Sequence, residues 1–236
     1  MSRTRMLHCS ISDYCQIYAL LLQAPTKRLI EAMVTGDFFD DFESVLHELG
    51  ADLVVNENDL AFLRSHCSQC SVEDLLHELR REYTRLFIKT SKEPVVGIWE
   101  ALFKWDADQS GNADQNAPQP LLFINDDAMK LMDTYKMIGL ARSSDFNNSE
   151  DHFAFQFIFL SKIHLILSLA EDEYSSIDEL LQDYMETRFK GWGPAFFLLC
   201  EQKTEVEAYR VFWRIGRTVS ELLLRLALGD KERSME

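Results

Sequence analysis

Four adjacent residues, Ser149, Glu150, Asp151 and His152, carry the side chains best suited to chemistry, and they stand directly before a run of aromatic and aliphatic residues. An acid beside a histidine could act in general acid–base catalysis, and the two carboxylates could bind arginine. Adjacent residues of a helix do not face each other, however, and no local nucleophile motif accompanies the pair. The alternative is structural. Asn148 or Ser149 would cap the following helix, with both acids in its first turn, so Asp151→Ala would cost only about 0.3–1 kcal/mol.

A second group of reactive side chains lies in the segment HCSQC, from His66 to Cys70. A structural zinc site usually needs four ligands in two spaced pairs, and this chain has no second pair. The redox use of a Cys-x-x-Cys pair needs a strand–helix context that is missing here. We therefore expect Cys67 and Cys70 to be free thiols and no metal to be bound. No glycine-rich phosphate-binding loop occurs, so we expect no bound cofactor.

The composition limits the possible partners. The 236 residues include 24 Lys and Arg against 39 Asp and Glu, a net charge of −15. Binding to nucleic acid or to anionic lipid depends on basic residues, so both partners are disfavoured and a basic partner is favoured. The five cysteines suit a reducing compartment. The N-terminus lacks the pattern of a secretory signal, and we expect a cytoplasmic protein.

The elements that must position these residues are predicted to be helices throughout, which makes the protein all-α. Thr26, Ser71 and Asn125 are predicted helix caps, and Gly50 and Gly139 are predicted helix ends. The segment from Phe153 to Ala170 is apolar on nearly every face but contains Lys162, so we expect a buried central helix that does not span a membrane. We expect one domain over residues 1–236. The polar segment from Asp106 to Pro120 should be its most mobile internal loop.

Four segments in order carry a family resemblance: RREYTRLFI (80–88), PVVGIWEALF (94–103), MDTYKMIGL with NNSEDHFAFQFIFLSKI (132–163), and FKGWGPAFFLLC with AYRVFWRIGRTVSELL (189–223). Their order and spacing resemble the TorD/DmsD family of chaperones for molybdenum enzymes. The chain departs from the family pattern at Gly97 and Ser149, where proline is usual, and at Ala101, where serine is usual.

The resemblance implies an all-helical, non-enzymatic cytoplasmic chaperone. It would bind the twin-arginine leader of a molybdenum oxidoreductase subunit and hold the precursor until its cofactor is inserted. It implies no nucleic-acid partner and no stable membrane insertion, and a monomer or a helix-exchanged dimer. Asp151 and His152 would serve leader binding more than stability. The implied peptide-binding residues are Asp151, His152, Glu150, Trp99, Glu100, Phe103, Tyr83, Leu86, Phe87 and Pro94.

Two other functions stay open from the sequence. The first is a nitrate-reductase-type assembly chaperone that acts on the body of the enzyme instead of its leader. The second is a hydrolase that uses Asp151 and His152 as acid and base.

Overall fold

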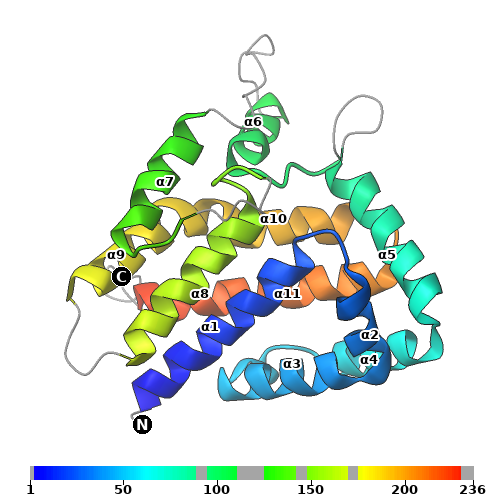
Figure 1. Ribbon diagram of the computed structural model, residues 1–236. Helices are drawn as coiled ribbons and strands as arrows, with labels where there is room; N and C mark the ends of the chain where they lie inside the picture. The colour runs from blue at the N-terminus through cyan, green and yellow to red at the C-terminus, as the bar shows by residue number, and fades with distance from the viewer. Residues whose placement is uncertain (1–2, 89–94, 111–124, 142–147, 170–174, 230–236) are drawn as a thin grey trace, which may run out of the picture.

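The computed structural model describes residues 3–88, 95–110, 125–141, 148–169 and 175–229, and within these ranges the backbone is helical apart from connecting segments and one isolated β-bridge (Figure 1). The predicted all-α class is confirmed. In chain order the helices are α1 (Arg3–Leu21), α2 (Lys27–Thr35), α3 (Asp37–Glu48), the 3-10 turn η1 (Ala51–Leu53), α4 (Glu57–Gln69), α5 (Val72–Phe87), α6 (Glu100–Ser110), α7 (Asp126–Met137), α8 (Phe153–Leu169), α9 (Ser175–Tyr184), the π-helical turn η2 (Met185–Phe189), α10 (Lys190–Lys203) and α11 (Glu207–Leu228).

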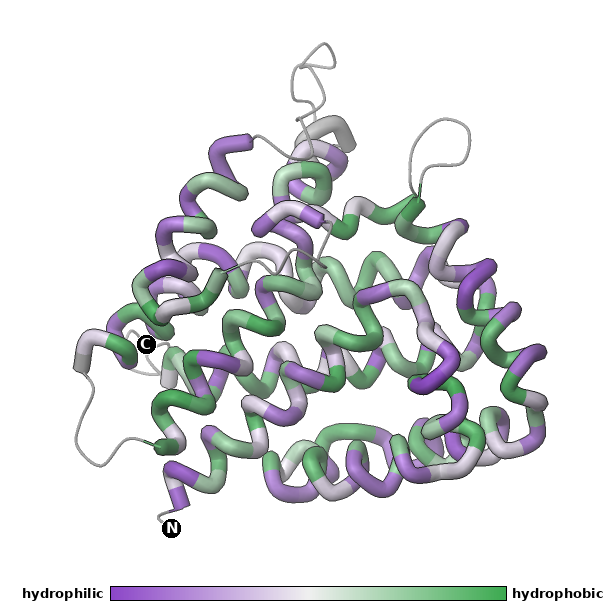
Figure 2. Tube along the Cα trace, in the orientation of Figure 1, coloured by the Kyte–Doolittle hydropathy of each residue, from purple (hydrophilic) through white to green (hydrophobic). Residues whose placement is uncertain are grey.

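Helix α8 is the centre of the bundle, as its composition predicts. Twelve of its 17 residues are buried, against ten of the 22 residues of α11. On one side Phe155 and Phe159 contact the ring of Tyr135 in α7, and at its start Phe153 stacks on Trp192 of α10 with 4.1 Å between ring centroids. Figure 2 shows this concentration of hydrophobic residues along α8 and the mixed character of the peripheral helices. Neither α8 nor any other helix of the described ranges is long and apolar enough to cross a membrane.

Helix α1 lies alongside α8 (Figure 1), and two polar side-chain pairs bridge the contact. The hydroxyls of Ser12 and Ser161 are 3.0 Å apart, and the Nδ1 atoms of His8 and His164 are 2.8 Å apart. Because both pairs are at least partly buried, each polar group satisfies its neighbour where water does not reach. The α1–α8 pair therefore forms one layer of the bundle.

The second layer is formed by α10 and α11, which cross behind α1 and α8 in Figure 1. The hydroxyl of Tyr18 in α1 donates to the backbone carbonyl of Phe212 in α11 at 2.8 Å. Gly216 makes this close approach possible, because a Cβ atom at that position would lie 2.6 Å from the Tyr18 ring. The two layers thus meet across a large aromatic core.

The predicted helix ends are confirmed. The side chains of Thr26, Ser71 and Asn125 each accept a hydrogen bond from the backbone N–H three residues on, which satisfies one of the free donors of the first helical turn. Gly50 and Gly139 both have a φ of +68°, in the left-handed region that glycine occupies at low cost.

One predicted boundary was wrong. Residues 106–110 of the expected loop belong to α6, which continues to Ser110. The sequence DADQS contains no glycine or proline, so nothing stops the helix before Gly111. Residues 111–120 of the expected mobile loop lie outside the described residues.

Candidate peptide-binding site

Two of the segments singled out in the sequence meet through their backbones at the start of α8. The N–H of Glu100 donates to the carbonyl of Asp151 at 2.9 Å, and the N–H of Phe153 donates to the carbonyl of Ile98 at 3.0 Å. These two bonds form an isolated antiparallel bridge between Trp99 and His152. Trp99, Glu100, Asp151 and His152, which were predicted to contribute to one site, therefore lie side by side.

The bridge also decides where α8 begins, and the predicted cap was wrong. Neither Asn148 nor Ser149 caps the helix. His152 does so, because its carbonyl accepts from the N–H of Gln156 at 3.2 Å and its Nδ1 accepts from the N–H of Ala154 at 3.1 Å. His152 pairs with Trp99 in this bridge, and the helix begins at the next residue, Phe153. Glu150 and Asp151 thus precede the first turn.

His152 is fully enclosed, with its ring edge-on to Trp99 at 5.4 Å between centroids. Burial lowers the pKa of His152 to about 3, so the imidazole is neutral near pH 7. A general base works best with a pKa near the working pH, so this environment disfavours the acid–base role of His152. The indole N–H of Trp99 is buried and has no acceptor within the described residues.

Asp151 is also fully buried, and it joins three elements. Its carboxylate accepts from the hydroxyl of Ser149, from the backbone N–H of Ala101 in α6 at 3.3 Å, and from the side-chain amide of Asn125, the cap of α7, at 3.3 Å. Burial raises the pKa of Asp151, and these hydrogen bonds oppose that rise because they favour the charged form. In this conformation the side chain holds α6, α7 and the start of α8 together.

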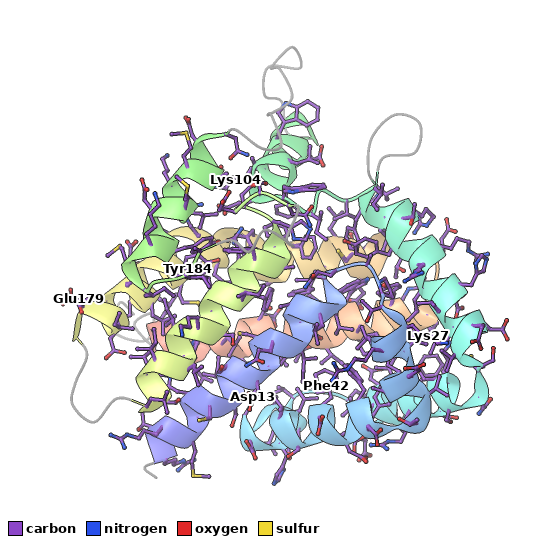
Figure 3. All side chains as sticks on the ribbon, in the orientation of Figure 1. Asp13, Lys27, Phe42, Lys104, Glu179 and Tyr184 are labelled. Atoms are coloured by element: carbon purple, nitrogen blue, oxygen red, sulfur yellow. The ribbon has the colours of Figure 1, made fainter. Side chains whose placement is uncertain are left out.

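Beside this point lies a network of charges centred on Glu100, whose side chain is 0% exposed. Nη1 of Arg188 donates to both carboxylate oxygens of Glu100, at 3.0 and 2.9 Å. The amide of Gln156 donates to Glu100 at 3.0 Å, and Nζ of Lys104 lies 2.6 Å from its Oε1. The hydroxyl of Tyr184 donates to the carbonyl oxygen of the Gln156 side chain at 2.5 Å. Figure 3 labels Lys104, at the outer end of this network, and Tyr184, at its inner end.

Asp127, in the first turn of α7, brings a second carboxylate to the same cations. It lies 3.3 Å from Nζ of Lys104 and 3.5 Å from Nη1 of Arg188. Arg188 comes from the π-helical turn η2, a type of distortion that is common at functional sites. The network therefore pairs two carboxylates with two cations, and one of its cations is a guanidinium. Sequence reasoning missed Asp127 and Arg188, because no local motif marks them, and Lys104, although its i,i+4 spacing from Glu100 is a local signal for a helical ion pair.

A pocket of about 260 Å³ lies beside the C-terminal half of α7, near Glu150. The hydroxyl of Tyr135 donates to the backbone carbonyl of Glu150 at 3.0 Å, which places this residue at the pocket. Methionines at 129, 132 and 137 of α7 are exposed nearby in sequence. The complete lining within the described residues is Met132, Tyr135, Lys136, Leu140, Ala141 and Glu150. The pocket thus combines a largely apolar lining with one carboxylate, Glu150, and one cation, Lys136.

The other predicted site residues lie elsewhere. Tyr83, Leu86 and Phe87 of α5 and Phe103 of α6 are buried in the hydrophobic core. In this conformation they are inaccessible to a peptide, and the surrounding helices would have to move before a peptide could contact them. Pro94 lies outside the described residues.

The cysteine segment shows no sign of a metal site. Within the described ranges no group of three or more His, Cys, Asp or Glu side chains is placed to hold a metal ion. Cys67 is buried, and burial raises the pKa of its thiol to about 12. A thiol with such a pKa is protonated near neutral pH and is a poor ligand and nucleophile.

The chain is similar to a solved structure and matches a protein-family model. A putative redox enzyme maturation protein from Archaeoglobus fulgidus has a similar crystal structure, with a TM-score of 0.52, 17% sequence identity, and coverage of 89% of this chain and 93% of that one. At this identity the likeness shows a shared fold. No curated protein sequence matches the chain. The family model described as the nitrate reductase delta subunit matches residues 55–198. Because this match covers more than half of the chain and agrees with the TorD/DmsD-like segments, the protein belongs to the nitrate reductase delta subunit family, which includes the TorD-type chaperones.

Proposed function

We propose that this protein is a cytoplasmic maturation chaperone of a molybdenum oxidoreductase, and that it binds the twin-arginine leader of that enzyme beside α6 and α7. Family membership supports the chaperone role. The observation that carries leader binding is the carboxylate pair of Glu100 and Asp127, which already holds the guanidinium of Arg188. Carboxylates that accept hydrogen bonds from one guanidinium have further lone pairs with which to accept from a second.

The charge of the molecule fits a basic ligand. With a net charge of −15, the protein attracts a segment that carries two arginines, and this attraction speeds encounter. Asp127 is 24% exposed, so its carboxylate is accessible to a peptide. Asp151 and His152, which are buried, would act by positioning α6, α7 and α8 without contacting the leader in this conformation.

The apolar part of a leader also finds a matching surface. The pocket near Glu150 and the exposed methionines belong to α7, the helix that carries Asp127, and methionine adapts its shape to varied apolar partners. Among the described residues the buried indole N–H of Trp99 finds no acceptor, and an unpaired buried donor typically costs about 1–3 kcal/mol. An opening of the site that brought a peptide carbonyl to this N–H would recover that cost.

The test is calorimetric titration with a synthetic twin-arginine leader peptide at low and high salt. Asp127→Asn should weaken binding by tenfold or more, because a hydrogen bond between charged groups contributes about 1.5–3 kcal/mol. Asp133→Asn is the matched control, because Asp133 lies on the same helix. Its side chain is 76% exposed, and within the described residues it pairs with Lys136. Equal affinities for the two variants would exclude the carboxylate pair as the leader site.

The family description favours a second candidate, binding to the body of a nitrate-reductase-like subunit. The two functions separate in one experiment. A low-salt pull-down first identifies the oxidoreductase subunit that the protein binds. The protein is then titrated with two ligands, the leader peptide of that subunit alone and the subunit without its leader. Binding only to the leaderless subunit would replace leader binding with body binding.

A further inference from the structure

We propose that Lys104 is a displaceable internal cation that occupies the leader-arginine position on Glu100 and Asp127, a position whose carboxylate oxygens suit arginine better than lysine. This inference rests on the proposed leader-binding function. It concerns which of the two cations in the network a ligand replaces.

The two cations are held very differently. The Arg188 side chain is 14% exposed and donates to both oxygens of Glu100. The Lys104 side chain is 48% exposed and reaches Glu100 and Asp127 from the solvent side. Half-exposed ion pairs contribute little to stability, so Lys104 can return to water at small cost. Arg188 cannot leave without stranding a buried carboxylate.

Departure of Lys104 would open a position suited to a guanidinium. Lys104 lies 2.6 Å from one oxygen of Glu100 and 3.3 and 3.4 Å from the two oxygens of Asp127. Three carboxylate oxygens therefore converge on one ammonium, which offers only three rotatable donors. A planar guanidinium offers five donors in a fixed fork and can bond both oxygens of Asp127 while it reaches Glu100.

The exchange has a consequence for specificity. A leader arginine that replaces Lys104 gains the paired hydrogen bonds that an ammonium cannot make. A leader lysine would replace one ammonium by another and gain nothing at this position. The resident lysine therefore penalises both ligands equally, but only arginine offsets the penalty with better geometry.

The experiment compares wild type, Lys104→Met and Lys130→Met by calorimetric titration with two synthetic peptides, one with the twin arginines and one with lysines in their place. Lys130→Met is the matched control, because Lys130 is an exposed residue of nearby α7 and the change in net charge is the same. Near-ultraviolet circular dichroism and the thermal midpoint check that each variant is folded.

We expect Lys104→Met to bind the arginine peptide about three- to tenfold more tightly, since no resident cation has to leave. The lysine peptide should gain by about the same factor, because the departing cation penalises both ligands equally, and the arginine-to-lysine affinity ratio should stay as in wild type. Lys130→Met should leave both affinities close to those of wild type. If wild type binds the arginine peptide but Lys104→Met binds it no more tightly, the displacement proposal is wrong and leader binding stands. If no variant binds either peptide, both proposals are wrong.

Discussion

Replacement of Asp151 by alanine is the sharpest test of how the site is built. Asp151 is fully buried, and its carboxylate accepts hydrogen bonds from Ser149, Ala101 and Asn125. Truncation to alanine leaves these three donors without their acceptor. A buried donor left unpaired costs about 1–3 kcal/mol, and relaxation recovers part of the sum, so we expect a loss of about 3–5 kcal/mol in the free energy of unfolding. For a chain of this size that corresponds to a fall of roughly 10 °C in Tm.

The assay is urea denaturation followed by circular dichroism, with Tm measured in parallel. Asp151→Asn keeps one acceptor oxygen and should lose less, about 1–2 kcal/mol. The control is Asp133→Ala. Asp133 is exposed and, within the described residues, pairs with Lys136, so this change should alter the free energy of unfolding by no more than about 0.5 kcal/mol.

A loss below about 1 kcal/mol for Asp151→Ala would refute this reasoning. Asp151 would then fit the small stability effect of the structural alternative considered from the sequence, in which it is a carboxylate near a helix N-terminus. The hydrogen bonds of Asp151 instead indicate a positioning role. Its removal should loosen the junction of α6, α7 and α8, and we therefore expect lower stability together with weaker leader binding.

Three further outcomes are expected. Glu100→Gln should destabilise the fold by about 2–4 kcal/mol in urea denaturation, because Arg188 stays largely buried with one charged partner fewer; a change below about 0.5 kcal/mol would contradict the network. Burial lowers the pKa of His164 to about 3, below its unfolded value of 6.5, so the unfolded state binds the proton first and stability is lost as pH falls below 6.5. The slope from this residue should approach about 1.4 kcal/mol per pH unit near pH 5 and disappear in His164→Gln, whereas replacing His47, whose side chain is 81% exposed, should leave the slope as it is. Maleimide labelling of the native protein, read by mass spectrometry, should modify the half-buried Cys9 and Cys70 and spare the buried Cys67. Fast labelling of Cys67, or stoichiometric zinc by elemental analysis, would contradict the assignment of Cys67 as a buried free thiol.

The amino-acid sequence determined the features that depend on neighbouring residues. Periodic apolar positions and the caps at Thr26, Ser71 and Asn125 predicted the helices, because a cap needs only a side chain and a backbone N–H three residues away. The burial of α8 followed from apolar residues on all its faces. The boundary of α6 was missed because a polar segment without glycine or proline is compatible with both loop and helix.

Tertiary structure decided the site. The pairing of residues 98–100 with residues 151–153 moved the cap of α8 to His152, and no local pattern encodes a bond between two distant segments. The ion pair of Glu100 with Arg188 joins residues 88 positions apart, and Asp127 and Lys104 join it from two other points of the chain. Asp127 and Arg188 read in the sequence as ordinary surface residues, whereas Glu100 was expected at the site and Lys104 lies one helical turn from it. Only the packing of α6, α7 and the π-helical turn against α8 brings Asp127 and Arg188 to that pair, because burial and charge pairing depend on which surfaces the folded chain brings into contact.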